Sequence, residues 1–173
     1  MPKHYNVLFL CTGNSARSIM AEAILNKKGS PNLTAYSAGS HPKAAVHPAA
    51  LRQLERAGLS TTGLHSKSWD EFAKPGAPPL DFVFTVCDNA ASEVCPVWPG
   101  RPITAHWGVQ DPALVEGSQR QIDEAFLGAF TILDQRIDLF LALPLSSLDN
   151  LTIKKKIDQI GQTETGVPPS SFD

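Results

Sequence analysis

Cysteine is scarce in this sequence, and the few cysteines do not fit a structural role. The chain of 173 residues contains only Cys11, Cys87 and Cys95. An odd number of cysteines without a recognisable export signal argues against a disulfide framework. Three thiols without a short-spaced pair do not complete a four-thiolate zinc site, and the scattered histidines show no metal-ligand spacing. We therefore predict no bound metal, and either inert burial or thiol chemistry for the cysteines.

Long apolar runs and an excess of one charge are also lacking. No run approaches the roughly 20 residues of a membrane span, and the first residues are too short for a secretory signal. Lys and Arg total 15 against 17 for Asp and Glu, so no basic excess marks a nucleic-acid partner. We therefore expect a cytoplasmic protein with neither a membrane nor a nucleic-acid partner.

Apolar segments that alternate with helical patterns predict an α/β fold. The apolar runs predict strands at 6–10, 33–37, 80–86 and 103–107. Four further segments show helical patterns. The first ends at Gly29, the second begins at Pro48, the third spans 119–143, and Ser147 is the predicted N-cap of the fourth. Strands that are apolar throughout and alternate with helices are typical of a parallel sheet covered on both faces. We expect one domain over residues 1–160 and a disordered tail over residues 161–173.

A loop of small and polar residues directly follows the first predicted strand. It runs from Cys11 to Ser18, includes Arg17, and is followed by a helical pattern. Backbone N–H groups of such a loop can converge on one anion, and the helix N-terminus adds partial positive charge. Gly13 and Asn14 both tolerate a positive φ. The same field favours Cys11 as a thiolate nucleophile, and the Ser18 hydroxyl is a candidate donor to its sulfur. The residues predicted to bind an oxyanion are Thr12, Gly13, Asn14, Ser15, Ala16, Arg17 and Ser18.

The segment Val7–Ser18, together with the downstream pair Asp111-Pro112, resembles the low-molecular-weight protein tyrosine phosphatase superfamily. The resemblance runs from about Tyr5 to about Leu143, and it is strongest to the arsenate reductases built on that fold. It implies a four-stranded parallel sheet of order 2-1-3-4, flanked by helices on both faces. It also implies that Cys11 attacks the oxyanion and that Arg17 binds it.

Asp111 is implied by the same resemblance to be the general acid. By itself, an Asp before a Pro in a loop is more often a turn former. A positioned carboxylic acid, however, can protonate an oxygen leaving group, and Pro112 restricts Asp111 to extended conformations.

The other two cysteines, Cys87 and Cys95, distinguish the hypothesis of a reductase from that of a phosphatase. Reducing arsenate takes two electrons, which two thiols supply when they form a disulfide. In the strand order 2-1-3-4, Cys11 and Cys87 follow neighbouring strands, about 4.8 Å apart. We therefore expect a relay for arsenic detoxification. Cys11 attacks arsenate, Cys87 releases arsenite, and Cys95 takes over the disulfide for thioredoxin, or glutathione and glutaredoxin. Alternatively, Cys87 is a buried core thiol and Cys95 an incidental one.

A protein tyrosine phosphatase that forms a Cys11 phosphocysteine is the main competing hypothesis. In that branch aromatic residues follow the Asp-Pro pair, whereas here the sequence continues as Ala113-Leu114-Val115. Their absence favours a small inorganic oxyanion, arsenate or a phosphate-like ion. We expect Trp98 and Trp107 to have packing roles. A redox sensor without turnover is the weakest hypothesis, since it leaves Asp111 without a purpose.

Overall fold

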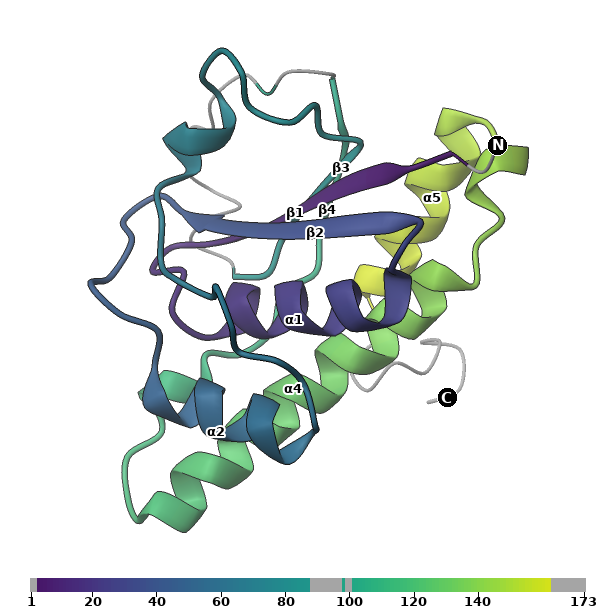
Figure 1. The fold of residues 1–173 in the computed structure, drawn as a ribbon. Coiled ribbons are helices and arrows are strands. Elements are labelled where there is room, and N and C mark those ends of the chain that lie inside the picture. Colours follow the sequence, from purple (N-terminus) through teal and green to yellow (C-terminus); the bar gives the residue numbers. More distant parts are fainter. Residues whose placement is uncertain (1–2, 88–97, 99–100, 163–173) are drawn as a thin grey trace, which may run out of the picture.

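Four parallel strands form the centre of the protein. The computed structural model describes residues 3–87, 98 and 101–162. The strands are β1 (Tyr5–Cys11), β2 (Leu33–Gly39), β3 (Phe82–Thr85) and β4 (Ile103–His106). They pair in the order β2-β1-β3-β4, and every pair is parallel (Figure 1). The predicted fold class and strand order are therefore confirmed.

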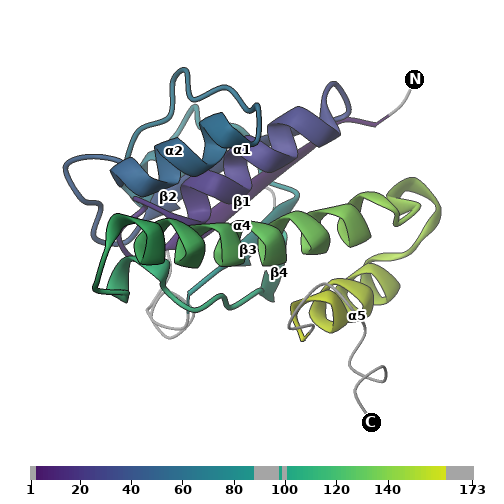
Figure 2. The same cartoon turned by 90° about the horizontal axis from the view of Figure 1, so that it is seen from below.

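Helices cover both faces of the sheet, with α-helices on one face and a 3-10 helix on the other. Among the described residues, the α-helices are α1 (Arg17–Gly29), α2 (Pro48–Arg56), α4 (Gln119–Leu141) and α5 (Asn150–Gly161). All four lie on one side, where α4 packs against α1 and α2, and α5 packs beside β4 (Figures 1 and 2). In the described part of the chain, the other face carries the 3-10 helix η1 (Trp69–Phe72). Two further 3-10 helices, η2 (Pro112–Leu114) and η3 (Leu145–Ser147), lie in connecting segments.

The alternation of side chains along β1 divides the core into two layers. Val7, Phe9 and Cys11 face the α-helices, whereas Leu8 and Leu10 face the side of η1. Because the strand is buried on both faces, it reads as a continuous apolar run in the sequence.

The two tryptophans in question have packing roles, as predicted. Trp107 is fully buried, and its ring stacks on Phe84 with the ring centroids 3.9 Å apart. Its indole N–H donates to the carbonyl of Ile157 in α5, at 2.9 Å. Trp98 is buried in the second layer, where its ring meets Trp69 edge-on.

The last helix begins later than the sequence pattern predicts. Ser147 lies in η3, and Asp149 is the N-cap of α5, where its carboxylate accepts a hydrogen bond from Thr152 N at 2.7 Å. The predicted cap at Ser147 was therefore wrong, because the carboxylate two residues later takes that role. Leu151, in the first turn of α5, is 85% exposed. Helix α5 ends at Gly161, and most of the predicted tail (163–173) lies outside the described residues. None of the helices described here is long and apolar enough to cross a membrane.

Candidate active site

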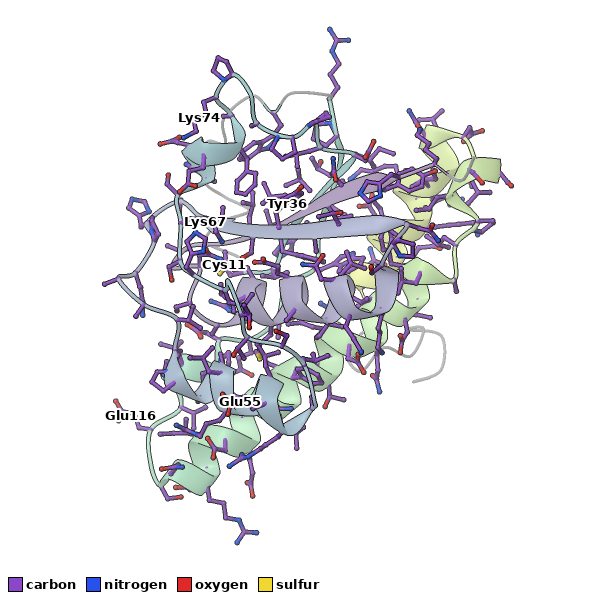
Figure 3. All side chains as sticks on the ribbon, viewed as in Figure 1. Cys11, Tyr36, Glu55, Lys67, Lys74 and Glu116 are labelled. Carbon is purple, nitrogen blue, oxygen red and sulfur yellow. The ribbon has the colours of Figure 1, made fainter. Side chains whose placement is uncertain are left out.

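The predicted site residues lie at the carboxyl ends of the strands. Cys11 is the last residue of β1, Cys87 follows β3, and Asp111 follows β4. Figure 3 shows Cys11 at the end of the sheet that meets the start of α1. In parallel α/β sheets this edge is where ligands bind, because the loops that leave the strands converge there. The topology therefore brings distant parts of the sequence to one site.

The anion loop, residues 12–16, turns its carbonyl groups outward. Backbone N–H groups of His41, Lys43 and His47 donate to the carbonyls of Thr12, Gly13 and Ser15, at 2.9, 2.9 and 2.8 Å. The carbonyl of Asn14 accepts from the Ser66 hydroxyl at 2.6 Å. In a trans peptide the next N–H points opposite to the carbonyl. The amide groups of residues 13–16 therefore point to the other side, as an anion cradle requires.

Two residues give this loop its shape. Asn14 adopts a φ of 46°, so it uses the left-handed conformation that the sequence predicts. Gly13 does not; its lack of a side chain serves a different purpose, since a Cβ there would lie 3.3 Å from the side chain of Lys43.

Gly39, at the end of β2, is a requirement that the sequence reasoning missed. A Cβ at this position would lie 2.5 Å from the carbonyl oxygen of Thr12, so no other residue allows β2 to pass so close. The only signal in the sequence is a glycine two residues after a predicted strand.

The start of α1 supplies positive potential on the side of the anion loop to which the amide groups of residues 13–16 point. Its N-cap is Ala16, whose side chain offers no acceptor, and the first turn of the helix contains no acidic residue. The first N–H groups of α1 are therefore not capped by a side chain, and the helix dipole favours an anion there.

Cys11 is buried, and its sulfur lies 2.8 Å from the Ser18 hydroxyl. Burial raises the pKa of the Cys11 thiol above its ordinary value, and the neighbouring Cys87 adds to this. The hydrogen bonds from Ser18 and the charge of Arg17 act in the opposite direction but do not outweigh burial. The expectation that the loop favours a thiolate is therefore met only in part. The raised pKa favours the protonated thiol, whose proton leaves when the sulfur attacks.

Cys87 lies beside the anion loop. Its sulfur accepts a hydrogen bond from Thr12 N at 3.3 Å and lies 3.6 Å from the Thr12 hydroxyl. The register explains this contact, because Leu10 pairs with Thr85 across β1 and β3. Two residues further along, Thr12 and Cys87 are brought opposite each other. Both Cys11 and Cys87 are buried and no disulfide joins them.

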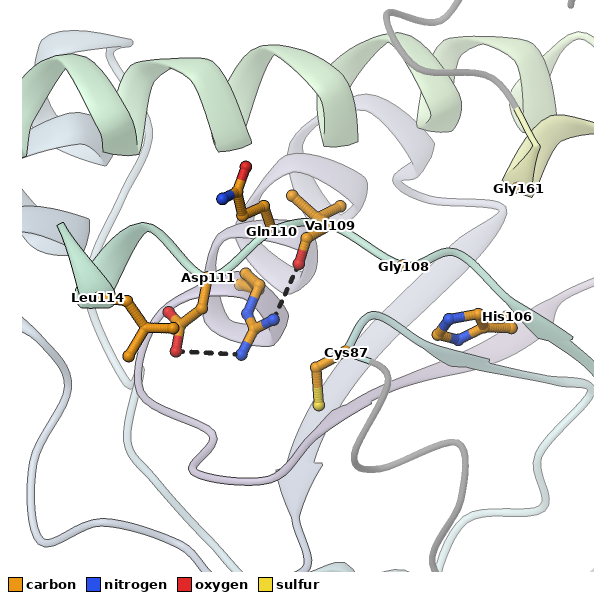
Figure 4. A pocket seen from close by; sticks show the side chains of 9 residues that line it. Cys87, His106, Gly108, Val109, Gln110, Asp111, Leu114 and Gly161 are labelled. Atoms are coloured by element: carbon orange, nitrogen blue, oxygen red, sulfur yellow. Dashed lines mark hydrogen bonds and ion pairs between the residues drawn. The ribbon is translucent and has the colours of Figure 1, made fainter.

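Arg17 and Asp111 line one cavity with Cys87. One guanidinium nitrogen of Arg17 donates to the carbonyl of Val109 at 2.8 Å, and another lies 3.4 Å from the Asp111 carboxylate (Figure 4). Asp111 is also the N-cap of η2, where it accepts from Ala113 N at 2.9 Å. The cavity has a volume of about 570 Å³. The structure thus brings together the loop, Arg17, Asp111, Cys11 and Cys87.

Cys95, predicted as the last thiol of the relay, lies outside the described residues. His106 borders the cavity, and its Nδ1 lies 2.8 Å from the Thr85 hydroxyl on the neighbouring strand.

Fold and site together define a class: a parallel α/β protein whose first strand ends in a cysteine-centred anion loop, with an Asp-Pro pair across the cavity. The chain belongs to the low molecular weight phosphotyrosine protein phosphatase family, whose profile matches residues 6–151. It is therefore an enzyme of the low-molecular-weight phosphatase superfamily.

Several proteins similar to this chain are arsenate reductases by name. The arsenate reductase of Halalkalibacterium halodurans is 34% identical over 134 residues, which cover 78% of this chain and 93% of the relative. A solved arsenate reductase in a phosphate-binding state has a TM-score of 0.62 at 25% identity, covering 80% of this chain and 97% of that one. The thioredoxin-dependent arsenate reductase of Corynebacterium glutamicum has a TM-score of 0.53 at 26% identity, covering 79% of this chain and 63% of that one.

Proposed function

We propose that this enzyme reduces arsenate to arsenite through a relay of cysteine thiols and so serves arsenic detoxification. One observation carries the proposal: the sulfur of Cys87 accepts a hydrogen bond from Thr12 N, inside the loop that follows Cys11. A hydrolase of this family needs one thiol and a water, whereas a reductase needs a second thiol within reach of the first. The names of the relatives support the same substrate.

In the first step, the sulfur of Cys11 attacks arsenic. The Cys11 thiol and HAsO₄²⁻ give a Cys11–S–AsO₃²⁻ adduct and water, so the thiol proton and one arsenate oxygen leave together. Asp111 serves as the general acid that delivers a proton to the departing oxygen. Arg17 and the amide groups of residues 13–16 hold the remaining oxygens.

In the second step, the sulfur of Cys87 attacks the sulfur of the adduct. A Cys11–Cys87 disulfide forms, the sulfur–arsenic bond breaks, and its electron pair stays on arsenic. Arsenic is thereby reduced from the pentavalent to the trivalent state, and HAsO₃²⁻ leaves with the Cys87 proton. The hydrogen bond from Thr12 N holds the attacking Cys87 sulfur beside the loop that follows Cys11.

In the third step, Cys95 attacks Cys87 and frees Cys11. The product is a Cys87–Cys95 disulfide, which an external dithiol reduces by thiol–disulfide exchange. Thioredoxin, or glutathione with glutaredoxin, is the reductant. The similarity to a thioredoxin-dependent arsenate reductase makes thioredoxin the first one to test. The enzyme needs no bound cofactor for this chemistry.

Phosphomonoester hydrolysis is the second candidate function, because Cys11, Arg17 and Asp111 suffice for it. The family takes its description from that activity. The residues after Asp111 favour a small oxyanion instead, since Leu114 is the only large side chain of η2 and it is 76% exposed.

The deciding experiment compares Cys87→Ser with the unaltered protein. Each is mixed with arsenate plus a thioredoxin or a glutaredoxin system, and separately with an aryl phosphate. Arsenite that forms only while Cys87 is present supports the reductase. Phosphate release that survives Cys87→Ser, without any arsenite, overturns it in favour of the phosphatase. Oxyanion binding without either product leaves a sensor, and Cys11→Ser is the control that abolishes both reactions.

A further inference from the structure

Two largely buried charged groups, Lys67 and Glu22, lie beside the anion loop, and the relay uses neither. Lys67 directly precedes Ser68, which forms an isolated parallel β-bridge with Gly39 at the end of β2. Glu22 lies on α1. Their side chains are only 9% and 15% exposed, and Lys67 Nζ lies 4.0 Å from the Glu22 carboxylate. Figure 3 places Lys67 at the same end of the sheet as Cys11. Buried charges are costly unless they are paired, so their presence here calls for an explanation.

Lys67 is fastened to β2 by both its side chain and its backbone. Its ammonium group donates to the carbonyl of Ser37 at 3.0 Å, and its carbonyl accepts from Gly39 N at 2.9 Å. Glu22 accepts a hydrogen bond from the hydroxyl of the same Ser37. The ion pair therefore holds residue 67 against β2 and α1 at once.

A continuous chain of hydrogen bonds leads from Lys67 to the nucleophile. Lys67 N donates to the side-chain oxygen of Asn14 at 2.9 Å, and the amide nitrogen of Asn14 donates to the Ser18 oxygen at 2.8 Å. The oxygen of Ser18 lies 2.8 Å from the sulfur of Cys11. Because the Ser18 oxygen accepts from Asn14, its own proton is directed to the Cys11 sulfur.

This direction favours the thiolate. A hydrogen bond donated to a charged sulfur lowers its pKa, and Ser18 is the largest of the influences that lower the pKa of Cys11. If the Asn14 side chain turned away, the Ser18 hydroxyl would lose the partner that orients it. The orientation of Asn14, in turn, depends on the backbone of Lys67.

We infer that Lys67, held in place by Glu22, is a positioning residue that keeps the Ser18 hydroxyl directed at the Cys11 sulfur. This inference rests on the proposed role of Cys11 as the nucleophile. It goes beyond the relay, because it assigns a task to an ion pair that touches neither the oxyanion nor the reacting sulfurs. The alternative is that the pair only fills space between β2 and α1.

The charges around the pair agree with this assignment. Burial lowers the pKa of Lys67, while Glu22 and Glu71 counteract it. Burial raises the pKa of Glu22, while the Ser37 hydrogen bond, Lys67 and His65 counteract it. Each group thus helps to keep the other charged in a place that disfavours both charges.

The test measures alkylation of Cys11 by iodoacetamide across pH in the full chain, with the Cys11 peptide followed by mass spectrometry. This readout needs no turnover, so it succeeds or fails independently of the reductase assay. Lys67→Met keeps the length of the side chain and removes its charge, and Glu22→Gln keeps the shape and the hydrogen bond from Ser37. We expect about tenfold slower alkylation at neutral pH for Lys67→Met, with the pH midpoint about one unit higher. Glu22→Gln should change both in the same direction and by less.

Two control variants distinguish an effect of Lys67 on the position of the Ser18 hydroxyl from an effect on the stability of the protein. Lys28→Met removes an ion pair that α1 makes with Asp134 and Asp138, and it should leave the alkylation profile unchanged. In a Ser18→Ala background, Lys67→Met should have no further effect on the profile, because the chain to Cys11 is already broken. A lower melting temperature of Lys67→Met with an unaltered profile overturns the inference. Additive effects of Lys67→Met and Ser18→Ala on the pH midpoint of alkylation would also overturn the inference.

Discussion

Replacing Asp111 by Asn should slow the chemistry and tighten oxyanion binding at the same time. The carboxylate of Asp111 has two partners, Ala113 N at 2.9 Å and the Arg17 guanidinium at 3.4 Å. Asn keeps an oxygen for the first contact, so η2 retains its N-cap. It cannot donate a proton as an acid, and it does not form an ion pair with Arg17. The two functions of Asp111 are therefore separated by one substitution.

The magnitudes of the two effects differ widely. Loss of a general acid typically costs about 10²–10⁴-fold in rate. The Arg17–Asp111 pair has side-chain exposures of 14% and 28%, so we take the modest value of an ion pair in contact with solvent, about 0.2–1 kcal/mol. Freed from that pair, Arg17 should bind phosphate up to about fivefold more tightly, since about 1.4 kcal/mol corresponds to a factor of ten.

Single-turnover arsenite release measures the chemistry, and calorimetric titration with inorganic phosphate measures the affinity. The matched control is Asp149→Asn, because Asp149 caps α5 with a similar hydrogen bond and does not line the cavity. It should change neither quantity. An unchanged turnover of Asp111→Asn would remove Asp111 from the mechanism, and weaker phosphate binding would refute the competition for Arg17.

Three further predictions concern the structure around the site. Gly39→Ala should lower the stability by about 1–3 kcal/mol and weaken phosphate binding, because its Cβ meets the Thr12 carbonyl; unfolding in urea and calorimetric titration check this. Trp107→Phe should cost about 1–3 kcal/mol in urea unfolding, because it removes the hydrogen bond to the Ile157 carbonyl and leaves unfilled volume in the core. Burial lowers the pKa of His47, aided by nearby positive charges, so unfolding takes up a proton and stability falls as pH drops below about 6.5; thermal unfolding of His47→Asn should show a flatter decline.

Each of these predictions has an outcome that contradicts it. Wild-type phosphate affinity of Gly39→Ala would mean that the anion loop does not depend on the close approach of β2. Equal stability of Trp107→Phe would mean that neither the indole hydrogen bond nor the volume of the indole ring stabilises the core. A decline with pH as steep in His47→Asn as in the wild type would assign the proton uptake to other residues.

The parallel sheet and the edge at which the site lies could be predicted from simple patterns, whereas the order of the strands was implied by the resemblance to the superfamily. A strand such as β1, buried on both faces, must be apolar throughout, and only a parallel sheet explains several such strands between helices. Once the sheet is parallel, residues that follow its strands must meet at one edge. Cys11, Cys87 and Asp111 were predicted on that ground.

The supporting contacts could not be predicted, because they depend on distances between segments that are remote in the sequence. Lys67 reaches Ser37 and Glu22 only after β2 and α1 have packed together. The requirement for Gly39 arises from the path of the Thr12 backbone. The direction in which the pKa of Cys11 shifts could not be predicted either. The loop residues indicate hydrogen bonds to the sulfur, but they do not indicate how deeply the thiol is buried.

The pairing of β1 with β3 leaves little tolerance for changes in chain length just before Cys87. Deleting one residue between Phe82 and Cys87 would turn the thiol to the opposite face, into the layer that contains Leu10 and Val83. Deleting two would restore the face but move the sulfur back by about 6–7 Å, beyond contact with Thr12. A gap in an alignment at that short segment would therefore remove the contact between Cys87 and Thr12 on which the proposed relay depends, even where every cysteine is retained.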